Sequence, residues 1–430
     1  MKFYSTNNPK KSFSFQESFE LGIAPDGGLF MPGFLPVYSE IDESFSLNQI
    51  AFNISKLFIE EIDESNLLKL TKNLFDFDSP LIQLDENIFV LELFHGPTLA
   101  FKDFGALFLS KFQSYYSKKN NKDIAILVAT SGDTGSAVAN AFLNVDGVKV
   151  VLLYPSGKVS KIQEQQLTTL GGNIIAIEVD GTFDDCQSLV KSAFNDIQLK
   201  NKLRLTSANS INIGRLIPQI FYYFRAYSQL DEKGLPLYFS VPSGNLGNLT
   251  AGLFAKKIGL PVTKFISSLN VNKTFNSYLE TGIFTPKDAV ATLSNAMDVG
   301  NPSNIARIKN LYQNNFKSIT KDISAHSFSD DETTKCIKDV YQMYNYQICP
   351  HTAIGFLGIR KFESLNQRVK ANKIILSTAH PGKFQTTVQD SLGVKVKLPE
   401  RLEQSLRKVK TSIKLDSQFQ NFKSLLNELL

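Results

Sequence analysis

Six runs of β-branched and apolar residues constrain the fold of this chain more than any other feature. Each run is short and almost free of charge, and most of the segments between successive runs are long enough for a helix. Runs of this kind are typical of strands that are buried on both faces of a parallel sheet and joined by crossover helices. They span residues 124–130, 148–155, 173–181, 237–244, 262–270 and 373–380. The sequence therefore predicts an α/β protein with parallel sheets.

The six runs form two groups, one ending near residue 180 and one beginning near residue 237, which predicts two α/β domains with a cleft between them. Helical patterning in "LNQIAFNISKLFIEEI" indicates a mainly helical N-terminal region, "PLIQL" and "IFVLELF" indicate a hairpin, and "DDET" indicates a helix start. The predicted parts are an N-terminal helical region over 1–80, an α/β domain over 81–235, a second α/β domain over 236–390 and a C-terminal helical extension over 391–430.

Charge and cysteine content narrow the function classes. The net charge of +5 is a small excess of 46 basic over 41 acidic residues, and the one short basic tract is "RKVK" at 407–410, so we expect neither nucleic acid nor a membrane surface as a partner. The three cysteines lack CxxC spacing, and the N-terminus lacks the apolar core of a signal peptide; both predict a cytoplasmic protein. "CPH" at 349–351 offers only two metal ligands, so no metal site is expected.

Two glycine-rich loops follow strand runs. "TSGDTGSA" at 130–137 and "PSGNLGNLTAG" at 242–252 each join a strand to a helix, where free backbone N–H groups and the helix dipole favour an anion. Neither has the spacing of a Walker A loop or of a dinucleotide site. Because ligands collect beyond the carboxyl ends of parallel strands, these loops predict two anion sites at that edge.

A lysine in an apolar setting is a third candidate feature of the site, beside the two glycine-rich loops. In "ELFHGPTLAFKDFG", residues 92–105, we expect Thr98 to cap a helix that begins at Leu99, which places Lys102 in the first turn. The helix N-terminus and desolvation both lower the pKa of such an amine. A neutral amine is what Schiff-base chemistry requires, and pyridoxal phosphate would satisfy both the lysine and one glycine loop. The second loop could take a substrate carboxylate, and the hydroxyls of "STAH" at 377–380 could face the ring nitrogen.

Several motifs together resemble one family. "FYSTN", "GIAPDGGLFMP", "ELFHGPTLAFKDFG", "ATSGDTGSA", "SANSINIGR", "VPSGNLGNLTAG", "LSNAMDVGNPSN" and "TAHPGKF" are similar, in this order, to the longer branch of the threonine synthases. That family lies within the tryptophan-synthase-β-like (fold type II) pyridoxal phosphate enzymes. The resemblance covers nearly the whole chain, and it implies two parallel-sheet α/β domains of the tryptophan synthase β-like type.

The resemblance also implies roles for the matching residues. Lys102 would carry the cofactor, and Thr378 would face the pyridine nitrogen. Leu246 stands where many members have Phe, a change that a backbone N–H contact tolerates. Asp133 stands where more distant dehydratases have Asn, so its role stays open. The implied cofactor-phosphate loop is Gly244, Asn245, Leu246, Gly247 and Asn248; the substrate-carboxylate loop is Thr130, Ser131, Gly132, Asp133 and Thr134; and the substrate-phosphate residues are Asn209, Ser210 and Arg215.

The implied reaction converts O-phospho-L-homoserine and water to L-threonine and phosphate, in a monomer or homodimer. Two alternatives remain: a serine/threonine dehydratase or phospholyase on the same scaffold, and a non-catalytic protein that has lost its cofactor. "APDGGLFMP" and the "LAFKDFG" form of the lysine motif favour the implied threonine-forming reaction over a dehydratase. An intact Lys102 with both loops argues against a non-catalytic protein. We expect structural roles for His95 and His351, while His380 could instead shape the cofactor pocket.

Overall fold

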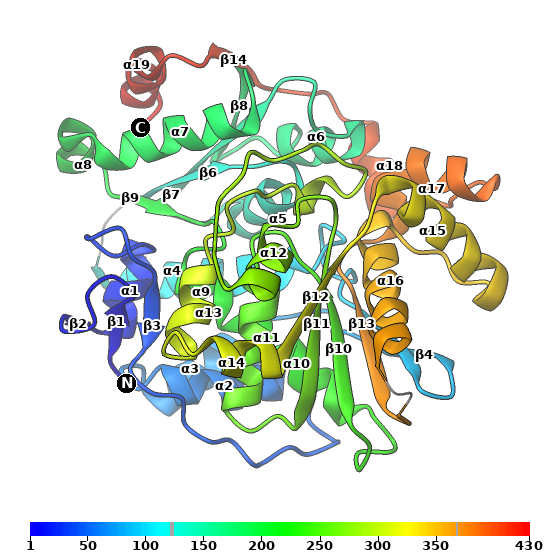
Figure 1. Cartoon of the computed structure of the whole chain (residues 1–430). Coiled ribbons are helices and arrows are strands. Elements are labelled where there is room, and N and C mark those ends of the chain that lie inside the picture. Colours follow the sequence, from blue (N-terminus) through cyan, green and yellow to red (C-terminus); the bar gives the residue numbers. More distant parts are fainter. Residues whose placement is uncertain (121–123, 367–368) are drawn as a thin grey trace.

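Two parallel sheets form the centre of the protein. The computed structural model describes residues 1–120, 124–366 and 369–430 (Figure 1). The first sheet has the strand order β14-β8-β7-β6-β9, with every neighbouring pair parallel. Its strands are β6 (Ile124–Ala129), β7 (Val148–Pro155), β8 (Ile174–Asp180), β9 (Leu205–Ser207) and β14 (Ile413–Asp416). The three runs predicted in this part of the chain are thus confirmed as strands.

The second sheet has the order β12-β11-β10-β13-β5-β4 and is parallel except for the hairpin of β4 and β5. Its strands are β4 (Leu81–Asp85), β5 (Ile88–Glu92), β10 (Leu237–Pro242), β11 (Val262–Leu269), β12 (Ile323–Ser327) and β13 (Asn372–Ser377). This confirms the predicted hairpin and the other three runs. The predicted α/β class with parallel sheets is therefore correct.

Two segments pair outside the part of the chain to which the sequence assigned them. The β4–β5 hairpin lies within the range predicted for the first α/β domain, yet β5 pairs with β13 of the second sheet. Strand β14 lies in the predicted C-terminal helical extension, yet it pairs with β8 of the first sheet. Long-range strand pairing of this kind leaves no local sequence signal, and the domain limits themselves stay a prediction.

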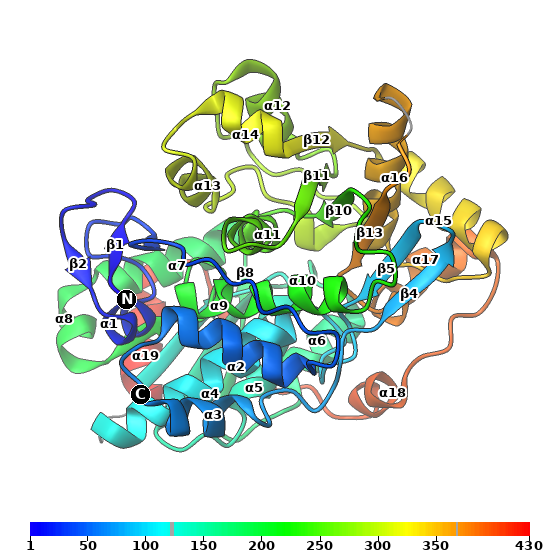
Figure 2. The same ribbon diagram turned by 90° about the horizontal axis from the view of Figure 1, so that it is seen from below.

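Helices cover both faces of each sheet (Figures 1 and 2). Alternate residues of β6 and β7 pack against α7, α8 and α19 on the outer face and against α4 and α5 on the inner face. The second sheet is covered on its outer face by α15, α16 and α17 and on its inner face by α11. The helices around the first sheet are α5 (Asp133–Phe142), α6 (Lys161–Thr168), α7 (Phe183–Asn195), α8 (Ile197–Lys202) and α19 (Phe419–Leu429).

Helices that lie between the two sheets join them into one core. One continuous apolar cluster runs from the inner face of the first sheet through α4 and α10 to the inner face of the second. Its elements include α4 (Lys102–Asn120), α9 (Ile213–Leu216), α10 (Pro218–Ser228) and α11 (Gly247–Lys257). The remaining elements are α12 (Thr274–Thr281), η1 (Asn295–Met297), α13 (Ile305–Leu311), α14 (Phe316–Asp322), α15 (Asp330–Tyr344), α16 (Pro350–Leu365), η2 (Pro381–Phe384), α17 (Gln385–Leu392) and α18 (Glu400–Leu406).

The N-terminal region is mostly helical, as predicted, but it also forms a small antiparallel sheet in the order β2-β1-β3. Its elements are β1 (Phe3–Ser5), β2 (Ser12–Phe13), α1 (Phe15–Leu21), β3 (Phe30–Pro32), α2 (Leu47–Phe58) and α3 (Glu64–Thr71). Capping boxes define the starts of α2 at Ser46 and of α15 at Ser329, which agrees with the helices predicted there. No helix in the described residues is long and apolar enough to cross a membrane.

Candidate active site

The helix that carries Lys102 begins later than predicted. α4 starts at Lys102 itself, and the expected start at Leu99 with a Thr98 cap is wrong. The backbone N–H and the hydroxyl of Thr98 instead donate to the carboxylate of Asp103, at 2.9 and 2.6 Å. Leu99 adopts a left-handed conformation (φ 59°), which cannot continue a helix. Lys102 nevertheless lies in the first turn, as predicted.

The turn before α4 brings Lys102 beside the end of β13. The Phe101 N–H donates to the Thr378 carbonyl, the His380 N–H donates to the Leu99 carbonyl, and Ala100 bridges Ala379. This short antiparallel pairing places Thr378 next to the lysine. Thr378 is buried, and its hydroxyl donates to no other described residue.

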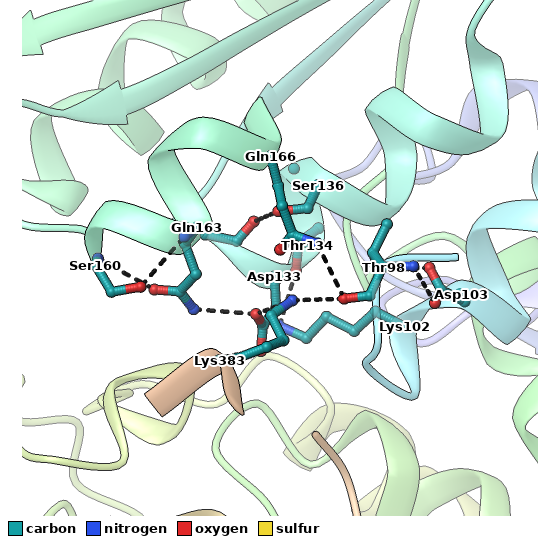
Figure 3. Close-up of polar contacts among 12 residues, drawn as sticks. Thr98, Lys102, Asp103, Asp133, Thr134, Ser136, Ser160, Gln163, Gln166 and Lys383 are labelled. Carbon is teal, nitrogen blue, oxygen red and sulfur yellow. Dashed lines mark hydrogen bonds and ion pairs between the residues drawn. The ribbon is translucent and has the colours of Figure 1, made fainter. Parts of the chain in front are cut away.

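The side chain of Lys102 is half-buried, and its amine is held by a hydroxyl. Its Nζ donates to the Thr134 hydroxyl at 2.9 Å, and the side chain extends toward the start of α5 (Figure 3). Burial lowers the pKa of Lys102 to about 8; the positive charges of Arg215 and Lys383 act in the same direction, and Asp133 opposes them. The predicted lowering of this pKa is therefore supported, chiefly through desolvation.

A glycine on α4 makes room for an arginine. A Cβ on Gly105 would lie 2.6 Å from Nε of Arg215 and 3.1 Å from the Arg215 carbonyl oxygen. Gly105 is one turn after Lys102, on the same face of the helix. The small residues that follow Lys102 thus leave space for a buried guanidinium beside the amine.

We expect Gly105→Ala to disrupt this packing. A glycine-to-alanine change inside a helix normally stabilises by roughly 0.5–1 kcal/mol. Here the added methyl group overlaps Arg215, so we expect thermal unfolding to show destabilisation of about 1–3 kcal/mol instead. Gly234→Ala is the matched control, because a Cβ there would meet no atom within 4 Å. A Gly105→Ala protein as stable as the wild type would contradict the packing argument.

The loop between β6 and α5 offers free backbone donors. Within the described residues, the N–H groups of Ser131, Asp133 and Thr134 donate to no protein acceptor. Thr130 Oγ1 accepts from the Gly132 N–H at 3.0 Å and from the Gly135 N–H at 2.8 Å, which fixes the turn. Free N–H groups at the start of a ten-residue helix form a surface suited to an anion.

The loop between β10 and α11 also offers free backbone N–H donors. In the part of the chain that the structure describes, the N–H groups of residues 244–248 donate to no protein acceptor. The Asn248 side chain fixes the loop by donating to the Pro242 carbonyl (2.8 Å) and accepting from Ser243 (2.6 Å). Leu246 is left-handed (φ 58°) and buried, and Gly247 opens the helix. A phosphate fits a loop of this construction.

The 209–215 segment contacts the 244–248 loop and packs against the helix that carries Lys102. Asn245 donates to the Ser210 hydroxyl at 2.7 Å. Arg215 is buried; one of its terminal nitrogens donates to the Ala208 carbonyl, whereas its Nε has no partner among the described residues. The buried Oδ1 of Asn209 also lacks a partner there. Burial lowers the pKa of Arg215 to about 10, which leaves it charged at neutral pH.

The contacts connect every predicted site segment, but not all directly. Lys102 donates to Thr134, lies beside Thr378 and is one helical turn before Gly105, against which Arg215 packs. The 244–248 loop is linked to the others through Ser210 and makes no hydrogen bond to Lys102 among the described residues. The arrangement combines an amine whose lowered pKa favours the neutral form, two groups of free N–H donors and a buried guanidinium. It can therefore hold an aldehyde, two anionic groups and a departing anion.

The sequence reasoning missed a buried lysine. Lys383 in η2 is fully buried, and its Nζ lies 2.8 Å from Oδ1 of Asp133. Gln163 also donates to this carboxylate, at 3.0 Å, and accepts from Asn295. The charges of Lys383 and Lys102 hold the pKa of Asp133 well below its usual range, although burial alone would raise it. A lysine five residues after a strand-end hydroxyl, within "TAHPGKF", was the available signal.

The contacts of two histidines agree with structural roles. His95 pairs with Glu92 at 2.7 Å on the surface, and His380 accepts from the Gly382 N–H and caps η2. His351 is buried with both ring nitrogens unpartnered among the described residues, and burial lowers its pKa to about 4. It is therefore uncharged at neutral pH.

Three known protein families together match almost the whole chain. Residues 74–378 match the family described as pyridoxal-phosphate dependent enzyme, residues 2–75 match the threonine synthase N terminus, and residues 352–426 match the threonine synthase C-terminal family. A threonine synthase from Haemophilus influenzae is 42% identical over 99% of each chain. The crystal structure of threonine synthase from Escherichia coli is similar with a TM-score of 0.93 and 41% identity over 100% of both chains. A PLP-bound threonine synthase from Brucella melitensis gives a TM-score of 0.91 and 31% identity over 100% of this chain and 99% of that one.

Proposed function

Because the chain belongs to the threonine synthases, a family of pyridoxal phosphate-dependent enzymes, we propose that it converts O-phospho-L-homoserine and water to L-threonine and phosphate. The observation that carries the proposal is the half-buried Lys102 amine, whose pKa is lowered and which donates to Thr134 of a loop with unpartnered N–H groups. The family assignment gives the cofactor and the enzyme class. The substrate and the roles of individual residues are the proposed part.

The residues fit pyridoxal phosphate. Lys102 would hold its aldehyde, the free N–H groups of residues 244–248 would bind its phosphate, and the Thr378 hydroxyl would face its ring nitrogen. Asn209 and Arg215, each with a buried polar atom that lacks a partner in the described chain, would take the substrate phosphate together with Ser210. When bound, the cofactor supplies an electron sink for negative charge at the substrate Cα.

The chain's own groups then perform three tasks. The N–H groups of Ser131, Asp133 and Thr134 bind the substrate carboxylate and so fix the amino acid for reaction. The Nζ of Lys102, when it is a free amine, would accept the Cα proton, which an amine with a pKa of about 8 can do at neutral pH. Arg215 stabilises the charge that develops on the departing phosphate. A Cβ proton must also be lost as the γ-phosphate departs, Cγ must gain a proton, and water must then add at Cβ to give threonine.

The compartment and assembly are also part of this proposal. All three cysteines are buried and free, which supports a reducing, cytoplasmic setting. We expect a monomer or a homodimer, because a single chain supplies every residue proposed for the site.

A product assay with three substrates tests the proposal. We expect purified holoenzyme to release phosphate and threonine in equal amounts from O-phospho-L-homoserine, and to be much slower on L-threonine and L-serine. Threonine is measured by chromatography and keto acid by a coupled reductase. Keto acid from serine or threonine, without threonine from the phosphorylated substrate, would instead identify a dehydratase on the same scaffold.

A further inference from the structure

Lys383 occupies an unusual position between the two halves of the site. It lies in η2, directly after the end of β13 of the second sheet, and its side chain is fully buried. Its Nζ lies 2.8 Å from Oδ1 of Asp133 on the first sheet's side and 2.9 Å from the Thr98 carbonyl oxygen before α4 (Figure 3). Taking an ammonium and a carboxylate out of water is costly, and an apolar pair of similar volume would often be as stable. A buried pair at this place therefore calls for a reason other than stability.

Asp133 creates an electrostatic problem for the proposed carboxylate site. Its backbone N–H is one of the free donors of the 130–134 loop, yet its own carboxylate is buried within the same turn. A substrate carboxylate bound there would meet a like charge a few ångströms away, in surroundings of low dielectric constant. Gln163 orients the Asp133 carboxylate but adds no charge. The loop can bind an anion only if that carboxylate has a lasting counter-charge.

Lys102 is not a suitable counter-charge. Its Nζ donates to Thr134, and in the proposed function this nitrogen alternates between the cofactor and the free amine. Its charge therefore changes during the reaction. Lys383 takes part in no such exchange, and both of its polar contacts hold it against Asp133 and Thr98.

We propose that Lys383 is a positioning residue that neutralises Asp133 and holds its carboxylate aside, so that the N–H groups of the 130–134 loop remain able to bind the substrate carboxylate. This inference rests on the proposed function, since it assumes a carboxylate substrate at that loop. It also gives Asp133, whose role the sequence left open, a definite place: a fixed carboxylate paired across the two halves of the site, not a group that touches the substrate.

Four proteins test the inference: the wild type, Lys383→Met, Asp133→Asn and the double variant. Methionine keeps most of the lysine stem while removing the charge. We expect Lys383→Met to raise the KM for O-phospho-L-homoserine by about tenfold or more, because an uncompensated carboxylate repels the substrate. In the Asp133→Asn background the same change should alter the KM by less than about threefold, since no charge is left to neutralise. Bound cofactor, measured by absorbance after release in alkali, should stay near one per chain throughout.

A partly buried lysine–aspartate pair elsewhere in the chain serves as the control. Lys256 lies 2.8 Å from Asp322, away from the proposed site. Lys256→Met should lower the unfolding temperature without raising the KM, which separates a general loss of stability from a charge effect on binding. If Lys383→Met alone does not fold, the comparison of the double variant with Asp133→Asn still decides the question.

The outcomes distinguish the two proposals. A KM that rises equally in both backgrounds would make Lys383 a direct substrate contact and overturn the inference, as would an unchanged KM in folded Lys383→Met. A wild-type protein that forms no threonine from O-phospho-L-homoserine would overturn the proposed function itself.

Discussion

Replacing Lys102 with alanine is expected to abolish threonine formation and to remove the visible absorption band of the lysine-bound cofactor. The amine is the only group on α4 positioned to bond covalently to an aldehyde among the contacts described above, and turnover should fall by more than about a thousandfold. Lys383 is close by, but its ammonium is paired with Asp133 and cannot take over this role. The measurement is an absorbance spectrum of the purified variant together with phosphate release.

Lys111→Ala is the matched control for this experiment. Lys111 lies on the same helix, α4, but is exposed to solvent. Its removal should leave both the spectrum and the turnover unchanged. Wild-type activity in Lys102→Ala would refute the assignment of Lys102, whatever the spectrum shows.

The strands could be predicted from the sequence because burial on both faces leaves a strong local pattern. β6 and β7 are runs of apolar residues, and their alternate side chains fill two different cores. β9, β12 and β14 were not predicted. They lie at the edges of their sheets, are short or only partly buried, and so carry little pattern of their own.

The parts of the site that are local in sequence were also predictable. A glycine loop between a strand and a helix can be recognised from a dozen residues, and both loops have the free donors expected of them. The start of α4 could not be placed, because the Asp103 carboxylate competes for the Thr98 donors and Leu99 turns left-handed. Thr98 is a good capping residue by type, and here a tertiary arrangement overrides that preference.

Contacts between distant segments were beyond the sequence. Lys383 and Asp133 are 250 residues apart, and nothing near either residue indicates the pairing. The same is true of Gly105 and Arg215, where the absence of a side chain on one helix makes room for a guanidinium from another segment. Local patterns thus predicted the two glycine-rich loops and Lys102, the family resemblance added Arg215, and the pairing of their charges follows from the fold.

Replacing Arg215 with alanine is expected to lower kcat/KM for O-phospho-L-homoserine by roughly a hundredfold to a thousandfold while leaving the cofactor bound. Within the described residues, the buried guanidinium donates to a backbone carbonyl and to no carboxylate, and its Nε has no acceptor. A phosphate dianion would supply that acceptor. Because the loss concerns the phosphorylated substrate, the cofactor spectrum should match that of the wild type.

Two further variants separate charge from geometry and from stability. Arg215→Lys should recover only part of the loss, because an ammonium offers a point charge and not a planar fork of donors. Arg225→Ala, on the neighbouring helix α10, removes an arginine that pairs with Asp78 away from the site, and it should cost stability but not kcat/KM. Burying the Arg215 guanidinium carries a desolvation cost, which an anion bound during the reaction would offset. Unchanged kinetics in a folded Arg215→Ala protein would therefore remove this residue from the site and leave the phosphate without a cationic partner.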